Sequence, residues 1–228
     1  MKKIIVTGSE GLIGAEICKY FERNNNKVYR LDLQLGHDLN DEEFVKSWFK
    51  KNPAKYLVNC FALNDAVQSD RKKGTLFDFS LESFSKYLDV NLVSLFSVCR
   101  QFVKNNNKSS IVNFSSTYGI VAPDQRIYGK SRQNSAVFYA ATKSAILNLT
   151  RYLAAYWQGK GIRVNTLSPG GVEKNQELNF RKKYSEKTML GRMAKKDEYV
   201  GPIIFLSSDA SSYMTGSNLI VDGGWTAW

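Results

Sequence analysis

The sequence predicts an α/β fold in which helices cover both faces of a doubly wound parallel sheet, giving three layers. Short β-branched segments alternate along the chain with longer segments of helical periodicity, which is typical of strand–helix units. The length of 228 residues and the hydrophobic fraction of 43% suit one domain, residues 1–228, with a single sizeable core. Such sheets bind ligands beyond the carboxyl ends of their strands, so we expect the functional residues there.

The expected strands and helices follow from the local pattern of apolar residues. The first helix is marked by Ile13, Ile17 and Phe21, whose four-residue spacing places them on one helical face. The expected strands are Lys3–Thr7, Val28–Leu33, Tyr56–Phe61, Ser110–Ser115 and Ile162–Leu167, with Leu219–Val221 in a last one; the later helices are Glu42–Lys50, Leu81–Lys104 and Ser135–Gln158. Only five residues separate Asp32 from Asp38, too few for a crossover helix and a further strand. We therefore expect the fold to be shortened between the second strand and the next helix.

The charge is distributed unevenly along the chain. There are 32 Lys and Arg against 21 Asp and Glu, so the formal net charge is +11 and the pI is about 9.5. A balance this basic admits a nucleic acid, a membrane surface or an anionic small molecule as partner. Residues 120–196 hold 15 basic and 4 acidic residues, which is the whole excess.

Several function classes are disfavoured by what the sequence lacks. The apolar run in MKKIIVTG is too short for a signal peptide, and no window approaches the roughly 18 apolar residues of a membrane span. Cys18, Cys60 and Cys99 are an odd number of widely spaced residues with apolar neighbours, which indicates reduced core thiols. His37 is the single histidine and cannot form a multi-histidine metal site. We expect a cytoplasmic protein with neither a metal nor a membrane partner.

A glycine-rich turn follows the first strand. The segment is Thr7-Gly8-Ser9-Glu10-Gly11-Leu12-Ile13-Gly14. Glycines allow a pyrophosphate to approach the backbone, and the start of the helix supplies N–H donors. Asp32 lies 18 residues after Gly14, where a carboxylate accepts both ribose hydroxyls of a dinucleotide, although a simple strand-end cap is the alternative. Because this carboxylate would repel a 2′-phosphate and Leu33 and Gln34 supply no cation, the pattern favours NAD over NADP.

Two residues of a later helix suggest catalysis. Tyr139 and Lys143 are four apart, so their side chains share one helical face. This spacing is common by chance, and a surface tyrosine beside a surface lysine is the alternative. Here the pair follows a strand that ends in Asn113-Phe114-Ser115-Ser116.

Taken together, these pieces resemble the short-chain dehydrogenase/reductase family over essentially the whole chain. The matching segments are TGSEGLIG, Asp32, the Asn91 of DVNL, IVNFSS, YAATK, IRVNTLSPGG and TGSNLIVDGGW, in the family's order. The resemblance implies a Rossmann-type fold, NAD as cofactor and hydride transfer between the nicotinamide and a secondary alcohol or ketone. It assigns the cofactor to Gly8, Ser9, Gly11, Leu12, Ile13, Gly14, Asp32, Asp38, Leu39, Ala62, Tyr139, Lys143, Pro169, Gly170 and Val172.

The resemblance also implies the catalytic roles. Tyr139 would be the acid/base, Lys143 its electrostatic partner, Ser116 the donor to the substrate carbonyl, with Ser115 as the alternative, and Asn91 the anchor of a proton relay. A free tyrosine titrates near ~10, too high for a base at neutral pH. An ammonium ~5 Å away favours the phenolate by roughly 3 kcal/mol, about two pKa units. We therefore expect the pKa of Tyr139 to be lowered.

This chain departs from the family between Ser116 and Tyr139, where 22 residues stand in place of about a dozen. The tentative substrate residues are Tyr118, Arg126, Lys130 and Arg132. One interpretation of this insertion, residues 117–138, is an anion-binding lid; the other is a solvated charged loop. The basic segment Glu173–Lys196, which covers substrate in the family, would face the same cleft. The loop and the motifs around it resemble bacterial oxidoreductases of flagellin modification and nonulosonic-acid biosynthesis, which implies an anionic sugar derivative as substrate.

Smaller departures concern the cofactor. Asn59-Cys60-Phe61-Ala62 replaces the family's Asn-Asn-Ala-Gly, and Lys174 replaces a threonine that often contacts the nicotinamide.

Two other functions stay open as alternatives. One is a cofactor-binding regulator without catalysis. The other is direct nucleic-acid binding, which the concentration of charge in the active-site segments disfavours. The apolar excess of the two longest helices predicts a homodimer or homotetramer. The tail that ends in Trp225 and Trp228 would pack on a neighbouring subunit or on its own chain.

Overall fold

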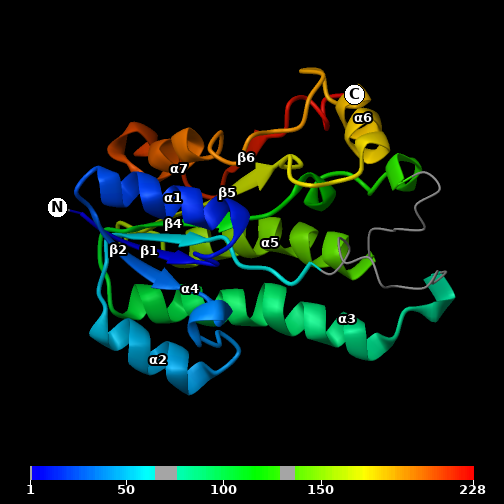
Figure 1. Ribbon diagram of the computed structural model, residues 1–228. Coiled ribbons are helices and arrows are strands. Elements are labelled where there is room, and N and C mark those ends of the chain that lie inside the picture. The colour runs from blue at the N-terminus through cyan, green and yellow to red at the C-terminus, as the bar shows by residue number, and fades with distance from the viewer. Residues whose placement is uncertain (1, 65–75, 129–136) are drawn as a thin grey trace.

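The computed structural model describes residues 2–64, 76–128 and 137–228, and six parallel strands form one sheet within it (Figure 1). The strands are β1 (Lys3–Thr7), β2 (Lys27–Leu31), β3 (Tyr56–Asn59), β4 (Ser110–Phe114), β5 (Arg163–Pro169) and β6 (Asn218–Val221). Their order is β2-β1-β3-β4-β5-β6. The chain changes direction across the sheet between β1 and β3, so a ligand crevice is expected at the carboxyl ends of these two strands.

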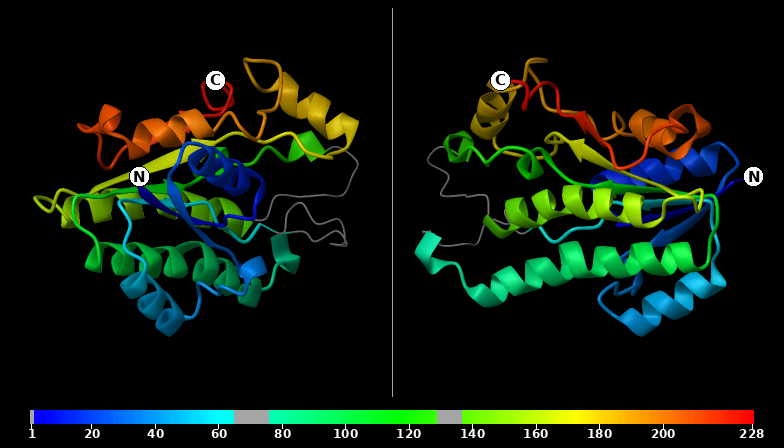
Figure 2. Two further views of the ribbon diagram at one scale, coloured as in Figure 1. Left: turned by 60° about the vertical axis from the view of Figure 1, so that its left-hand side comes forward. Right: turned by 180° about the vertical axis from the view of Figure 1, so that it is seen from behind.

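Helices cover both faces of the sheet, as predicted (Figure 2). The helices are α1 (Leu12–Arg23), α2 (Glu42–Lys51), α3 (Leu81–Leu88), α4 (Ser94–Lys104), α5 (Val137–Tyr156), α6 (Leu178–Glu186) and α7 (Val200–Ser207). Helices α1 and α7 lie on one face and α2, α4 and α5 on the other, while α6 lies near the C-terminus beyond the sheet. Within the described residues, no helix combines the length and apolarity that crossing a bilayer requires.

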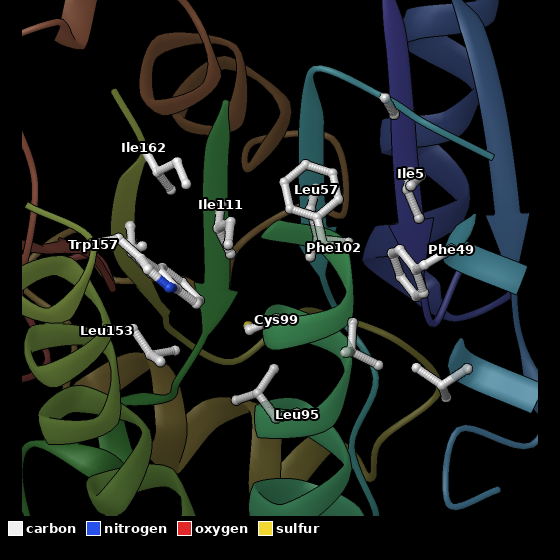
Figure 3. Packing of buried hydrophobic residues seen from close by; sticks show 14 of the residues in the cluster. Ile5, Phe49, Leu57, Leu95, Cys99, Phe102, Ile111, Leu153, Trp157 and Ile162 are labelled. Atoms are coloured by element: carbon white, nitrogen blue, oxygen red, sulfur yellow. The ribbon is translucent and has the colours of Figure 1, made fainter. Parts of the chain in front are cut away.

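The two faces are separated by the alternation of side chains along each strand. In β1, Ile4 and Val6 join the core under α1 and α7, whereas Ile5 joins the core under α2, α4 and α5. Figure 3 shows this second core, where Phe102 and Leu57 pack between the sheet and α4. The sequence prediction of a three-layer arrangement is confirmed.

The shortening after the second strand is also confirmed. A single 3₁₀ turn, Leu33–Leu35, is the only regular element between β2 and α2 among these fully described residues. Consequently β2 ends the sheet on this side, with no further strand beyond it in the described part of the chain.

One predicted helix is divided. Residues 81–104 form α3, a π-helical turn (Asp89–Val93) and α4. π turns inside helices often mark functional sites, because the extra residue redirects one side chain. Here the turn carries Asn91, which is 2% exposed. The strand ends differ from those predicted by one or two residues, as in the case of β2, where Asp32 caps the 3₁₀ turn and does not continue the strand.

Candidate active site

The glycine turn between β1 and α1 leaves no room for side chains at Gly8 and Gly14. A Cβ on Gly8 would lie 2.6 Å from the nitrogen of Phe61, and one on Gly14 would lie 2.1 Å from the oxygen of Gly8. Gly11 precedes α1 without a side-chain cap, and Leu12 and Ile13 begin the helix. The first N–H groups of α1 therefore remain for a ligand, and the turn fits the pyrophosphate of a dinucleotide.

Asp32 is held beside this turn. Its Oδ2 accepts a hydrogen bond from the Glu10 N–H (3.0 Å) and its Oδ1 from the Gln34 N–H (2.9 Å). The cap that the sequence left as an alternative is therefore present, but each carboxylate oxygen keeps a further lone pair that can accept a ribose hydroxyl. Arg30 forms ion pairs with Glu10 (3.1 Å) and Glu22 (2.9 Å), so its charge is already balanced.

The remaining predicted adenine and loop residues lie along the same edge. Asp38 is exposed and accepts a hydrogen bond from the Asn40 N–H (2.9 Å), and Leu39 is 8% exposed. Ala62 lies in the loop after β3 and is exposed, and Ser9 is fully buried in the glycine turn. These positions are compatible with the predicted contacts to a dinucleotide.

Buried polar side chains form a continuous series of hydrogen bonds from β1 to α5. The series includes Asn59, the first residue of the segment that departs from the family motif. Thr7 Oγ1 donates to Asn59 Oδ1 (3.0 Å), Asn59 Nδ2 donates to Asn113 Oδ1 (2.9 Å), and Asn113 Nδ2 donates to Thr150 Oγ1 (3.0 Å). These bonds link β1, β3, β4 and α5. The departure at residues 59–62 thus leaves the site's framework connected.

The serine pair after β4 is divided between two tasks. Ser115 is 2% exposed, and its hydroxyl donates to the Lys143 carbonyl (2.7 Å). The Ser116 hydroxyl accepts from the Tyr118 N–H (3.1 Å) and lies close enough to Tyr139 to act on the pKa of that tyrosine. The geometry therefore favours Ser116 over Ser115 as the partner of Tyr139.

Lys143 is buried beneath Tyr139. Its Nζ donates to the Phe114 carbonyl (2.9 Å) and lies 5.7 Å from the centroid of the Tyr139 ring. The residue is 3% exposed, and burial lowers its pKa to about 8. At pH 7 most of the side chain is still an ammonium.

The predicted lowering of the pKa of Tyr139 is wrong for the protein chain considered alone. Burial raises the pKa to about 12, and the neighbouring Ser116 hydroxyl opposes this only in part. The simple charge-pair argument omitted the cost of burying a phenolate, which outweighs the neighbouring Lys143. Tyr139 is therefore a protonated donor at neutral pH.

Asn91 joins the loop after β3 to the catalytic helix. Its Oδ1 accepts from the Leu63 N–H (2.6 Å), and its Nδ2 donates to the Leu63 carbonyl (3.1 Å) and to Thr142 Oγ1 (3.1 Å). Thr142 follows Tyr139 by three residues on α5. Asn91 thus has a fixed place between two segments of the candidate site.

The nicotinamide end of the predicted cofactor site lies after β5. Pro169 ends the strand, the Gly170 N–H donates to the Val221 carbonyl (2.9 Å), and Val172 pairs with Ala194 in a β-bridge. A Cβ on Gly170 would lie 2.8 Å from the Cα of Asp222. This segment is therefore packed against the end of β6 and against the backbone at Ala194.

Ion pairs neutralise part of the positive charge of the predicted anion lid and of the basic segment Glu173–Lys196. Asp124 pairs with Arg126 (2.9 Å) and with Lys187, and these cations lower its pKa. Arg126 is largely exposed, which agrees with the solvated-loop alternative. Further ion pairs join Arg181 to Glu173, Arg192 to Glu198 and Lys196 to Glu16. Lys130 and Arg132 lie outside the described residues.

Tyrosines surround the catalytic pair on this side. Burial and a hydrogen bond to Tyr128 raise the pKa of Tyr118, and Tyr128 also raises that of Tyr139. Tyr184 of α6 packs with Ile127 of the insertion and stacks on Trp225, which is 4% exposed. Trp225 thus packs on its own chain. No sequence pattern indicates Tyr184, because the residues that it contacts come from distant segments.

Known proteins are similar to this chain over nearly its whole length. A family model described as enoyl-(acyl carrier protein) reductase matches residues 15–226. The chain is 30% identical to the post-translational flagellin modification protein A of Campylobacter coli, covering 98% of each protein. It is also 30% identical to the L-tagatose-forming galactitol 2-dehydrogenase of Cereibacter sphaeroides, covering 98% of this chain and 94% of that one.

Solved structures agree with these relatives. A short-chain dehydrogenase from Leptospira borgpetersenii with bound NAD⁺ superimposes with a TM-score of 0.86 at 32% identity, covering 99% of this chain and 92% of that one. A putative 2-deoxy-d-gluconate 3-dehydrogenase from Agrobacterium tumefaciens with bound NADP gives a TM-score of 0.83 at 25% identity, covering 100% and 97%. With its sheet order, its Ser116, Tyr139 and Lys143 cluster and this similarity over nearly its whole length, the chain belongs to the short-chain dehydrogenase/reductase family.

Proposed function

We propose that the protein is an NAD-dependent oxidoreductase that interconverts a secondary alcohol and a ketone on an anionic sugar derivative. The observation that carries this proposal is the cluster of Ser116, Tyr139 and a buried Lys143, whose Nζ lies 5.7 Å from the centroid of the Tyr139 ring. Two hydroxyls that converge in this way can both bind one substrate oxygen. Membership of the family supports an oxidoreductase. The preference for NAD and the anionic sugar substrate are inferred from the residues described below.

The chain's residues perform the proton transfer in this proposal. When bound, the nicotinamide supplies or accepts the hydride. Ser116 and Tyr139 orient the substrate oxygen, and Tyr139, protonated at neutral pH, donates its proton as negative charge develops on that oxygen during reduction. The Lys143 ammonium then stabilises the phenolate, and its bond to the Phe114 carbonyl keeps it in place. In the oxidation direction the same phenolate accepts the proton.

The preference for NAD rests on the surroundings of Asp32. A carboxylate fixed by two backbone N–H groups would repel a 2′-phosphate. The neighbouring Arg30 is occupied by two glutamates and offers no free charge to such a phosphate. The proposal therefore predicts that NADP binds more weakly than NAD.

The sugar class is supported by the hydroxyl-rich wall beside Tyr139 and by the relatives. Tyr118 and Tyr128 provide phenol groups suited to hydroxylated substrates. The basic excess of residues 120–196 supports an anionic group on that sugar; Lys174 and Lys182 are exposed and form no ion pair within the described residues. The resemblance to the flagellin modification protein supports a place in surface-glycan or flagellin-glycan biosynthesis. We place this activity in the cytoplasm.

A substrate screen tests the function. Purified protein is assayed for NADH oxidation with ketoses, keto-sugar phosphates and nucleotide keto-sugars, and for NAD reduction with the corresponding alcohols. Tyr139→Phe is expected to lower turnover about 10³-fold on any productive substrate while NADH still binds. Binding of NADH without turnover on any compound would favour the alternative of a catalytically inactive cofactor-binding regulator. Equal turnover of the wild type and Tyr139→Phe would exclude the proposed mechanism.

We also propose that the chain forms a homodimer or homotetramer through α4 and α5. Phe96, Tyr152 and Tyr156 are exposed on these helices and line a groove of about 690 Å³. Apolar side chains gathered on adjacent helices suit a symmetric interface between copies. Light scattering that finds only a 25.8 kDa species would contradict this.

A further inference from the structure

A basic groove lies at the end of the sheet opposite to the candidate active site. It is lined by residues at the start of β3, β4 and β5, whereas Ser116 follows the far end of β4. The length of β4, Ser110–Phe114, separates the two ends by about 13 Å. One wall of the groove is the end of α5 with the turn after it, and the other wall belongs to residues 207–216. Trp157 and Ile162 close the groove toward the core that Figure 3 shows.

The groove carries more positive than negative charge. Its charged lining residues are Lys55, Lys108, Arg151, Arg163 and Asp209. Within the described residues, none of the four cations forms an ion pair. The cations of the predicted lid differ from these, since several of them are paired with carboxylates. The groove is therefore a place where the positive potential attracts an anion.

Arg163 supplies a fixed part of this charge. Its Nη1 donates to Ser211 Oγ (2.9 Å), and its Nη2 donates to the carbonyls of Leu206 and Ser208 (3.0 Å each). All three partners are neutral, so they hold the guanidinium in place without cancelling its charge. Arg163 thus contributes a steady positive potential at the start of β5, while the exposed Lys108 and Arg151 are available to contact a ligand.

Three buried hydroxyl groups of the groove have no hydrogen-bond partner within the described residues. They belong to Tyr56, Ser109 and Ser207, which are 4%, 4% and 3% exposed. Such unpaired groups are uncommon in folded proteins, because a buried hydroxyl without a partner costs free energy. An anionic oxygen would accept the O–H of these groups in charge-assisted hydrogen bonds. The unpaired hydroxyls therefore point to an anionic ligand independently of the charges.

We propose that this groove binds a small molecule through its phosphate group, with Lys108 and Arg151 at the rim and the unpaired hydroxyls at the floor. The groove has a volume of about 1000 Å³, at the upper end of the range for small-ligand sites. This volume exceeds what inorganic phosphate requires, which favours a phosphate monoester of an organic molecule. The phosphates of a duplex nucleic acid would meet the exposed rim but not hydroxyls that are buried between two walls. The site lies apart from the residues of the proposed function and does not depend on it.

Isothermal titration calorimetry tests binding, with and without saturating NADH, using ribose 5-phosphate, inorganic phosphate and ribose as probes. Ribose 5-phosphate should bind with a Kd below about 1 mM, inorganic phosphate more weakly and ribose not measurably. Equal binding of both phosphates would also support the site, with inorganic phosphate as its ligand. Lys108→Gln combined with Arg151→Gln should weaken the binding at least about tenfold, because two charge-assisted contacts are lost. Lys160→Gln, at an exposed position outside the groove lining, should leave it unchanged.

Three results of this titration would overturn the proposal. The first is no binding of either phosphate up to about 10 mM. The second is binding that is unchanged in the double variant, since the phosphate would then lie elsewhere, for example at the candidate active site. The third is binding of duplex DNA that is tighter than that of ribose 5-phosphate and is lost in the double variant, because the groove would then serve a nucleic acid.

Serine variants test the floor of the groove separately from its rim. Ser109→Ala and Ser207→Ala each remove a hydroxyl without a partner, so the urea midpoint of the ligand-free chain should stay unchanged or rise. Each should weaken the binding of ribose 5-phosphate at least about fivefold. Ser110→Ala is the matched control, because its hydroxyl donates to the Leu206 carbonyl (2.9 Å). This change should lower the midpoint and leave binding unaltered.

These measurements need neither a substrate nor turnover, so they stand or fall separately from the proposed function. Binding that is unaltered in both Ser109→Ala and Ser207→Ala would contradict the assigned floor, and the proposal with it. A lowered midpoint in these two variants, as large as that of Ser110→Ala, would show that their hydroxyls have partners within the fold and would also contradict it.

Discussion

The glycine turn with Asp32 and the wall formed by the insertion and α6 are held by different means. At the turn, backbone atoms exclude side chains, as at Gly14, and backbone N–H groups fix the carboxylate. In the wall, side chains from separate segments hold one another, as in the ion pair of Asp124 with Lys187 and the stacking of Tyr184 on Trp225. Cofactor-side geometry is therefore set by backbone contacts around the glycine turn, and substrate-side geometry by contacts between side chains.

Gly14 provides the strongest test of the backbone-limited region. Gly14→Ala would place a Cβ 2.1 Å from the Gly8 oxygen and force the turn away from α1. We expect NADH affinity to fall at least about 100-fold and the free energy of unfolding to fall by about 3 kcal/mol. Fluorescence titration and urea unfolding measure the two effects.

Gly201→Ala is the matched control for that change. Gly201 is exposed in α7, and a Cβ there meets nothing within 4 Å. Alanine should stabilise the helix by up to about 1 kcal/mol and leave NADH affinity unaltered. If Gly14→Ala behaved like Gly201→Ala, the turn would be more adaptable than its packing indicates.

Lys143, on α5 beneath Tyr139, belongs to neither region and tests the buried catalytic cluster through pH. Its folded pKa of about 8 lies below the ordinary value of 10.5, so between these values the unfolded chain binds a proton that the folded chain has lost. Stability contributed by this group should therefore rise from about pH 8 to 10.5, by about 3 kcal/mol in total. The cost of burying the ammonium is fully present below pH 8.

Urea unfolding of the cofactor-free chain over this pH range measures the effect as the difference between wild type and Lys143→Met. Lys160→Met, at an exposed position, supplies the control and should follow the wild type. A wild-type curve parallel to that of Lys143→Met would show that Lys143 is better solvated than its burial indicates.

The same contrast explains what the sequence could and could not predict. The strand–helix alternation, the glycine turn and the Tyr139–Lys143 spacing are local patterns, and they located the sheet, the shortened unit and the candidate catalytic cluster. The ion pair between Asp124 and Lys187 and the stacking of Tyr184 on Trp225 join segments far apart in the chain and leave no periodic signal. The sign of the Tyr139 pKa shift was missed for a related reason, since burial depends on packing and not on spacing.

Lys187 tests the wall held by side chains. Lys187→Gln breaks the ion pair that joins α6's end to the insertion at Asp124. Because such partly exposed pairs contribute about 1 kcal/mol at most, we expect KM for the sugar substrate to rise by no more than about fivefold, with unchanged NADH affinity. Steady-state kinetics and cofactor titration separate these two quantities. A loss of NADH affinity as large as that of KM would show that the pair supports the whole site.

Arg126 should give the smallest effect and distinguishes the two interpretations of the insertion. Its pair with Asp124 lies within one segment, and 89% of its side chain is exposed, so Arg126→Gln should change KM less than about twofold for a neutral ketose. An anion-binding role would instead raise KM for a sugar phosphate about tenfold while leaving that for the unphosphorylated sugar unchanged. Kinetics with this matched pair of substrates decides the question. Small and equal changes in KM for both substrates would assign Arg126 to a solvated loop. The charge of the substrate would then be recognised by other basic residues of 120–196.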